Sequence, residues 1–243
     1  MKNKYLKIIG WIPVSVLFFF FTISGHNPNQ KWRGANVGTI SFPVDVKKAS
    51  SAIVPRLDKL SIEEFHQVQH ISAEYNIDYR LILAMIEQES QFDNMALSSR
   101  GATGLMQLMP LTGGEVAEYL NLDESEQTFG NIKIGIHYFS KLLNLFHQGD
   151  AEDKLCLTLA AYNAGPSRIY DAQVLAAYIG EDPQRWSSIQ RVLPLLSKRF
   201  SSLHQSVWES GKPKSGYFGS WRQTIYYVEN TLRIYKDYLR LRD

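Results

Sequence analysis

Apolar side chains recur at helical spacing through most of the chain from Ser61 onward. Ser61 and Glu64 have the spacing of a capping box, in which each side chain bonds the other residue's backbone N–H at a helix start. Asp78 is placed to cap a second helix, and Thr112 with Glu115 repeats the capping pattern for a third. Because few runs alternate with the period of a strand, the pattern predicts a mostly helical domain.

Longer apolar stripes continue in the second half of the chain. An amphipathic stripe predicts a helix over 132–146, and two further apolar segments lie at 155–162 and 174–179. A long final helix is predicted over 221–239. The stretch 210–220 is rich in glycine and contains a proline, so we expect a loop or a short hairpin there.

The first 25 residues differ from the rest. Three lysines precede an apolar stretch from Ile8 to Ser24, which is the layout of a secretory signal peptide. That stretch is near the shortest length that spans a bilayer, so an uncleaved membrane anchor is an alternative. The sequence therefore predicts a signal peptide or anchor over 1–25, a linker over 26–60 and a folded domain over 61–243.

Composition removes several classes of function. Hydrophobic residues make up 44% of the chain and charged residues 21%, and the net charge is only +2, with no basic stripe of the kind that binds nucleic acid. Cys156 is the single cysteine, which excludes an intramolecular disulfide and favours a small core residue. His66 and His70 have helical spacing, but Gln67 stands where a zinc protease has its glutamate, so we expect no metal site there.

Glu89 is the most informative polar residue of the predicted second helix. It follows Ile82, Met85 and Ile86 on one helix face, near the C-terminal end. A carboxyl group in apolar surroundings has a raised pKa and can serve as a general acid. A charge at a helix end that reaches water is the simpler interpretation of the residue on its own. Glu87 lies about 200° around the helix and should face solvent or another contact.

Uncharged polar residues follow Glu89. Ser98 and Gln107 suit the hydroxyl and acetamido groups of a sugar, and Tyr162 offers a ring and a phenol. Gly165 stands where a helix would be capped. Asp93, the nearest second carboxylate, has the character of a helix-end or loop residue.

Three short motifs together resemble a known family. Glu89-Ser90, Gly104–Gln107 and Ala161–Gly165 are similar to the three motifs of the soluble lytic transglycosylase (SLT) domain, glycoside hydrolase family 23. Segments around 169–172, 191–197 and 227–230 resemble the catalytic module of membrane-bound lytic murein transglycosylase F. The resemblance implies a mostly α, lysozyme-like fold, as in goose-type lysozyme, for the domain at 61–243.

The resemblance also implies an activity and a site. Lytic transglycosylases cleave the MurNAc-β-1,4-GlcNAc bond of peptidoglycan without water and leave 1,6-anhydromuramyl ends, which makes Glu89 the single general acid and then base. The family's glycan-lining positions correspond to Ser98, Gln107, Met109, Tyr162, Asn163 and Tyr227.

Partners and location follow from the same resemblance. It implies peptidoglycan glycan strands as the partner, with no cofactor, metal or nucleic acid. It also implies a place in the bacterial envelope, whether periplasmic, secreted or anchored to the membrane through residues 1–25.

Two other functions stay open at this level. A goose-type lysozyme-like hydrolase would use the same glutamate but consume water, and product masses separate the two. The second alternative is a catalytically silent peptidoglycan-binding envelope protein. Such a protein would tolerate glutamine at position 89, so the presence of Glu89 argues against it.

Overall fold

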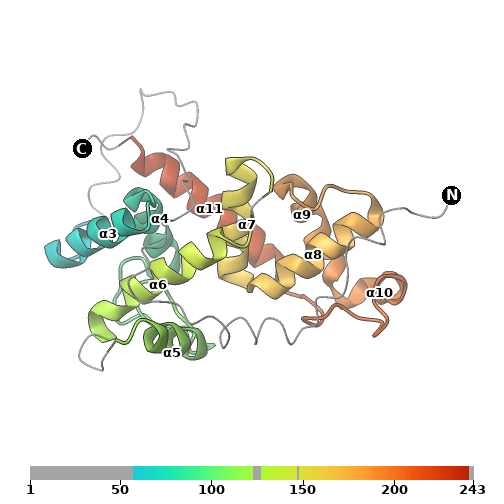
Figure 1. The fold of residues 1–243 in the computed structure, drawn as a ribbon, viewed down its shortest axis with the longest axis horizontal. Coiled ribbons are helices and arrows are strands. Elements are labelled where there is room, and N and C mark those ends of the chain that lie inside the picture. Colours follow the sequence, from blue (N-terminus) through green and yellow to red (C-terminus); the bar gives the residue numbers. More distant parts are fainter. Residues whose placement is uncertain (1–56, 123–126, 147, 241–243) are drawn as a thin grey trace. The chain divides into compact units, whose positions relative to one another are not determined.

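The computed structural model describes residues 57–122, 127–146 and 148–240 (Figure 1). These residues form helices joined by loops, and extended pairing among them is limited to isolated bridges of Thr103 with Leu97 and Leu108. The prediction of a mostly helical domain is therefore confirmed. None of the helices in these ranges is long and apolar enough to span a bilayer. The predicted signal or anchor segment and most of the predicted linker lie outside the described residues.

The described elements follow one another from α3 to α11. They are α3 (Ile62–Glu74), α4 (Tyr79–Ser90), α5 (Pro110–Tyr119), α6 (Gln127–Leu143), α7 (Ala151–Ala164), α8 (Pro166–Ile179), α9 (Trp186–Val192), the 3₁₀ turns η3 (Leu193–Leu196) and η4 (Lys198–Phe200), α10 (Ser201–Val207) and α11 (Trp221–Tyr238).

Two of the three predicted helix caps are confirmed. The Ser61 hydroxyl accepts from the Glu64 N–H at 3.2 Å, and Glu64 Oε2 accepts from the Ser61 N–H at 2.9 Å. Asp78 caps α4 by accepting from the backbone of the second helical residue. The third prediction was wrong, because α5 begins at Pro110 and Thr112 lies inside its first turn. Proline at the first helical position has its φ already set and lacks the N–H that would need a cap.

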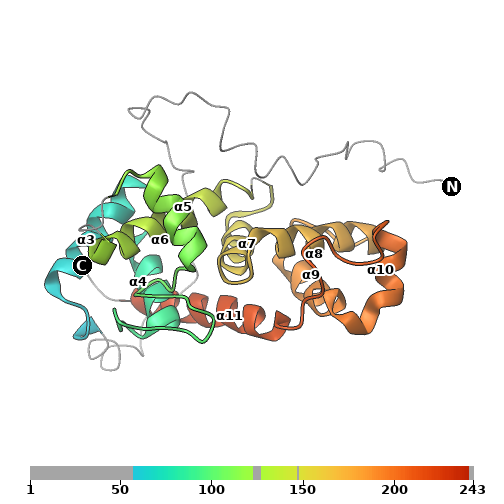
Figure 2. The ribbon, with the colours of Figure 1, turned by 90° about the horizontal axis from the view of Figure 1, so that it is seen from below.

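The core is centred on α4, whose residues 81–86 are all buried. The last helix, α11, packs along α4 and α7 in both views (Figures 1 and 2). Tyr238 of α11 donates to Glu87 Oε2 at 2.5 Å, and the Asn230 amide donates to the Gln88 side chain. Glu87 thus makes a protein contact, the second of its two expected environments. These bonds tie the last helix of the chain to α4.

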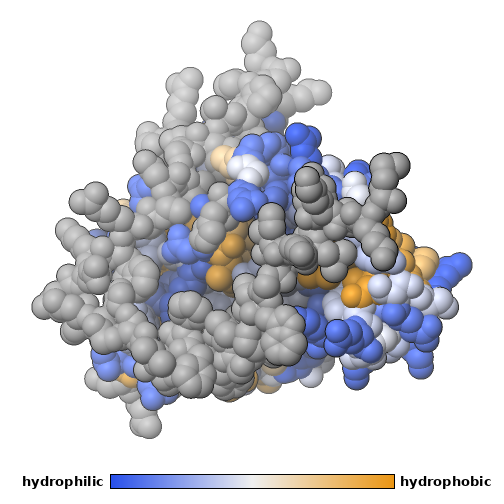
Figure 3. Space-filling model, turned by 45° about the vertical axis from the view of Figure 1, so that its right-hand side comes forward, coloured by the Kyte–Doolittle hydropathy of each residue, from blue (hydrophilic) through white to orange (hydrophobic). Residues whose placement is uncertain are grey.

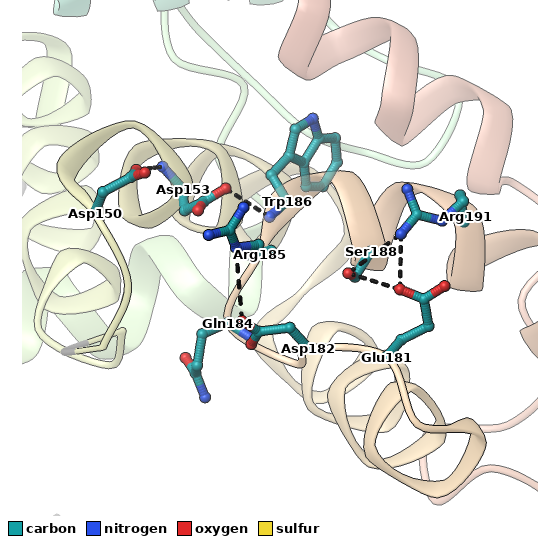
Figure 4. A network of polar contacts seen from close by, with 9 residues as sticks. All are labelled: Asp150, Asp153, Glu181, Asp182, Gln184, Arg185, Trp186, Ser188 and Arg191. Atoms are coloured by element: carbon teal, nitrogen blue, oxygen red, sulfur yellow. Dashed lines mark hydrogen bonds and ion pairs between the residues drawn. The ribbon is translucent and has the colours of Figure 1, made fainter.

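The segment from 186 to 207 contains helices that the sequence pattern did not predict. Each of α9 and α10 has 7 residues, which is too short for apolar periodicity to establish. A polar network holds α9 in place (Figure 4): the Trp186 N–H donates to Asp153 Oδ1 at 2.8 Å, and Arg191 pairs with Glu181 at 2.7 Å. Tertiary contacts, more than local sequence, therefore define this region.

The stretch 210–220 is a loop without strand pairing. The buried Asp171 carboxylate of α8 accepts from the Lys214 N–H at 3.1 Å and from the Ser215 N–H at 2.8 Å. A buried carboxylate that receives backbone N–H bonds keeps the loop on α8. The loop alternative of the sequence prediction is the one that the structure adopts.

The surroundings of Cys156 and of the histidines on α3 favour structural roles for these residues. Cys156 is buried, and burial raises the pKa of its thiol to about 12, so its role as a core residue is confirmed. His70 lies 3.3 Å from Glu74 on the exposed face of α3.

On the face drawn in Figure 3, hydrophilic side chains cover most of the described surface, and hydrophobic ones occupy limited areas. The described ranges hold no group of three or more His, Cys, Asp or Glu side chains suited to a metal ion.

Candidate active site

Glu89 lies in the last turn of α4, on the face formed by Ile82, Met85 and Ile86. The residue as a whole is half-buried, so part of it reaches the surface, while protein surrounds the carboxyl group closely. This burial raises the pKa of Glu89 to about 7 because the charged form loses its hydration. Hydrogen bonding from Tyr227 lowers the pKa but offsets only part of the rise. The raised pKa that the helix position predicts is confirmed.

Two tyrosines from different helices flank this carboxyl group. Tyr227 of α11 is 3% exposed, and Tyr162 comes from α7. Burial, followed by the negative charge of Glu89, raises both phenol pKa values well above 10, so both phenols remain protonated at neutral pH. The Tyr227 hydroxyl is near enough to Glu89 to lower its pKa, yet within the described residues it has no hydrogen bond of regular geometry. The Tyr227 hydroxyl can therefore donate a stronger hydrogen bond to Glu89 once Glu89 ionises.

The Tyr162 hydroxyl connects the site to the loop that follows α4. It donates to the Met106 carbonyl at 2.9 Å. The loop itself starts with two residues in the left-handed region, Gln91 at φ 53° and Phe92 at φ 64°. Such conformations cost free energy in residues other than glycine and tend to occur at functional sites. The buried Phe92 side chain helps to hold this turn directly after Glu89.

Asn131 of α6 fixes the same loop from the other side. Its Oδ1 accepts from the Met106 N–H at 2.8 Å, and its Nδ2 donates to the Thr103 carbonyl at 3.0 Å. Gly104 has φ 75°, and a Cβ there would lie 2.6 Å from Asn131 Nδ2. Only glycine fits both the backbone conformation and this close approach. Nothing in the sequence spacing pointed to Asn131.

Three of the residues expected to contact glycan lie on this loop or at its end. The Ser98 hydroxyl accepts from the Ala102 N–H at 2.9 Å. Gln107 donates its amide hydrogens to the carbonyls of Ala96 and Gly104, both at 3.0 Å. Met109 stands at the N-cap position of α5 and is 44% exposed. The Gln107 nitrogen therefore stabilises the loop, and its carbonyl oxygen is the part left for a ligand.

The remaining expected residues lie where α7 meets α11. Asn163 Oδ1 accepts from the Thr224 hydroxyl at 2.9 Å, which orients the amide. Thr224 is buried and was not singled out by the sequence, since a lone threonine inside a helical pattern carries no signal. Asp93 is exposed and accepts from the Met95 N–H at 2.9 Å in a local turn, as expected for a loop residue. Of the residues expected at the site, the structure places Tyr162 and Tyr227 around the Glu89 carboxyl group.

Comparison with known proteins identifies the kind of domain that holds this site. Residues 67–178 match the family model of the transglycosylase SLT domain. The chain therefore contains an SLT domain, and the resemblance drawn from the three motifs is confirmed.

Particular relatives are similar over more of the chain. Membrane-bound lytic murein transglycosylase F of Desulfosudis oleivorans is 37% identical over 157 residues, which are 64% of this chain and 33% of that protein. Membrane-bound lytic murein transglycosylase F 1 of Alkalilimnicola ehrlichii is 34% identical over 176 residues, covering 72% and 33%. The chain thus spans about a third of the length of these curated relatives. The 70 kDa soluble lytic transglycosylase of Escherichia coli has a TM-score of 0.49 and 21% identity, covering 72% of this chain and 24% of that one.

Proposed function

We propose that this chain is a peptidoglycan lytic transglycosylase with Glu89 as its single general acid and base. The observation that carries the proposal is the Glu89 carboxyl group, whose pKa of about 7 keeps a large share of it protonated at neutral pH. The SLT domain and the names of the relatives support the same substrate class.

In the first step, protonated Glu89 gives its proton to the oxygen between N-acetylmuramic acid and N-acetylglucosamine. The bond from the muramyl C1 to that oxygen breaks, and the glucosaminyl part leaves with the proton. The muramyl acetamido oxygen stabilises the positive charge that develops at C1, as in other substrate-assisted glycosidases. A second carboxylate is then unnecessary, which agrees with the exposed position of Asp93.

In the second step, the ionised Glu89 takes the proton of the muramyl C6 hydroxyl. The C6 oxygen bonds to C1 and closes the 1,6-anhydro ring, so no water is consumed and Glu89 returns to its protonated form. The Tyr227 phenol stabilises the carboxylate between the two steps, because its hydrogen bond favours the charged form of Glu89. Tyr162 keeps the 91–109 loop beside the carboxyl group through Met106.

The residues that we propose to contact the glycan are Ser98, Gln107, Met109, Tyr162, Asn163 and Tyr227. Asn163 is oriented by Thr224, and Gln107 offers its carbonyl oxygen. The proposed place of action is the bacterial envelope, reached through residues 1–25 as a cleaved signal or as an anchor.

Mass spectrometry of digested peptidoglycan tests the proposal, with Glu89→Gln as the matched control. Release of 1,6-anhydromuramyl products by the parent chain alone is the expected result. Products heavier by one water would instead identify a hydrolase, and the absence of products from both chains would favour the silent binder.

A further inference from the structure

Ion pairs are unevenly distributed among the arginines. Most arginines of the described residues pair with an aspartate or glutamate: Arg80, Arg185, Arg191, Arg233 and Arg240. Two of these pairs are drawn in Figure 4. Within the same ranges no carboxylate pairs with the others, which are Arg100, Arg168, Arg199 and Arg222.

The guanidinium groups of three unpaired arginines contact residues 218–221. This arginine cluster consists of Arg100, Arg168 and Arg222. Their guanidinium groups contact, in that order, the Ser220 hydroxyl at 3.4 Å, the Phe218 ring with 5.3 Å from Cζ to the ring centre, and the Trp221 ring with 4.1 Å. Aromatic faces hold a guanidinium group without neutralising its charge.

Contacts link the arginine cluster to the surroundings of Asn163, a residue proposed to bind glycan. Arg168 Nη1 donates to the Ala164 carbonyl at 2.8 Å, next to Asn163 in the chain. Asn163 in turn accepts from Thr224, which lies in the first turn of α11 together with Arg222. Arg100, the third arginine of the cluster, follows Ser98 by two residues in the chain. The cluster is therefore linked to Asn163 through neighbouring residues and to Ser98 through the chain.

Neighbouring acids do not neutralise the cluster. Asp171 follows Arg168 by three residues on α8, but its carboxylate receives the backbone N–H groups of Lys214 and Ser215. Arg168 Nε is buried and has no hydrogen-bond partner within the described residues. Burial and Tyr227 set the pKa of Glu89, and no arginine is among its causes. The arginines therefore do not stabilise the charged form of Glu89.

We propose that the arginine cluster of Arg100, Arg168 and Arg222 binds a carboxylate on the muramyl substituent of the glycan. The inference rests on the proposed function, since it takes peptidoglycan as the ligand. Guanidinium groups bind carboxylates in a bidentate manner, and both possible sources, the stem peptide and a free lactyl group, supply this chemistry. The cluster would then select the decorated strand and set its register at Glu89.

Binding is measured with the full chain carrying Glu89→Gln, so that strands are not cut. The probes are soluble glycan strands with peptides, the same strands with every carboxylate amidated, and peptide-free strands that carry only lactyl carboxylates. Arg100→Gln with Arg222→Gln removes two exposed cations and leaves the Arg168 bond to α7 intact. Arg199→Gln, an exposed and unpaired arginine outside the cluster, is the matched control, and thermal melting confirms that each variant is folded.

The double variant should bind unmodified strands about tenfold more weakly, as expected for the loss of a charged hydrogen bond, and amidated strands within twofold of the parent. Loss on peptide-bearing strands alone identifies the peptide carboxylate, and loss on peptide-free strands alone identifies the lactyl group. An equal loss on amidated strands, the same loss with Arg199→Gln, or no loss at all overturns the inference. Release of anhydromuramyl ends by the chain with Glu89 intact is scored separately, so failure of the cleavage proposal is distinguished from failure of this one.

Discussion

Glu89 and His137 are two ionisable groups whose neutral forms this fold favours by the same physical means. Glu89 lies between Tyr162 and Tyr227, and burial raises its pKa to about 7. His137 of α6 is 4% exposed, and burial followed by the Lys141 charge lowers its pKa to about 4. In both regions the loss of hydration outweighs the other effects on the charged form.

The two regions differ in access to the surface. His137 shares a hydrogen bond of 2.9 Å between Nδ1 and the Tyr75 hydroxyl, and its ring lies 5.3 Å from that of Tyr119. Its Nε2 atom is buried without a partner in the described residues. Glu89 keeps part of its surface exposed, whereas His137 is almost completely covered. A perturbed pKa marks a functional site only where the group is also accessible, and this comparison separates the two cases.

The largest expected difference between the regions is in cleavage. Glu89→Gln should reduce the rate of anhydromuramyl release by about 10³-fold or more, because it removes the only proton donor. His137→Gln should change the rate at pH 7 less than about twofold, since the group does not face substrate. Initial rates by product chromatography measure both. An active Glu89→Gln variant, or an inactive but folded His137→Gln variant, would reverse the assignment.

The second difference concerns stability at high pH. Between pH 4.5 and about 7 the folded chain holds a proton on Glu89 that the unfolded chain has lost, so the unfolding free energy falls as pH rises. The cost approaches about 3 kcal/mol above pH 7, from roughly 1.4 kcal/mol for each pKa unit. Glu89→Gln should therefore gain stability relative to the parent at pH 8 but not at pH 4. Urea unfolding at both pH values measures this, and an equal difference at the two would contradict it.

The third difference has the opposite sign. His137 stays neutral in the folded chain while the unfolded chain takes up a proton, so the parent loses stability as pH falls from 6.5 towards 4. After allowance for partial solvent screening, the loss is about 1–2 kcal/mol. The free-energy difference between the parent and His137→Gln should shrink by that amount over this interval. Urea unfolding at pH 6.5 and pH 4 tests it, with His70→Gln on the exposed face of α3 as control.

The smallest effect is on the pH profile of cleavage. Activity should fall as pH rises through about 7, where Glu89 loses its proton. Tyr227→Phe removes a donor that favours the carboxylate, so the alkaline limb should move to higher pH. Tyr75→Phe makes the same change beside His137 and should leave the limb in place. A downward shift in Tyr227→Phe would mean that the phenol stabilises the protonated acid.

Much of the helical architecture was predictable because it depends on periodicity and local capping. Ser61 with Glu64 and Asp78 cap the helices that their spacing predicted. Thr112 did not, because Pro110 starts α5 without a side-chain cap. The helices α9 and α10 are too short for a periodic signal, and contacts such as that of Trp186 with Asp153 position α9. The position of Glu89 on an apolar face was readable, whereas its partners were not.

The helical class, the apolar face that carries Glu89 and the motifs of an SLT domain could all be read from the amino-acid sequence. These follow from residues near one another in the chain, whose spacing sets which side chains share a helix face. Only the folded chain shows that Tyr227 and Tyr162 flank Glu89, that Asn131 holds the loop at Gly104, and that Arg100 and Arg168 contact residues 218–220. These contacts join residues far apart in the chain. Packing of α11 on α4 and α7 brings Tyr227 and Tyr162 to Glu89. Local spacing carries no information about such contacts.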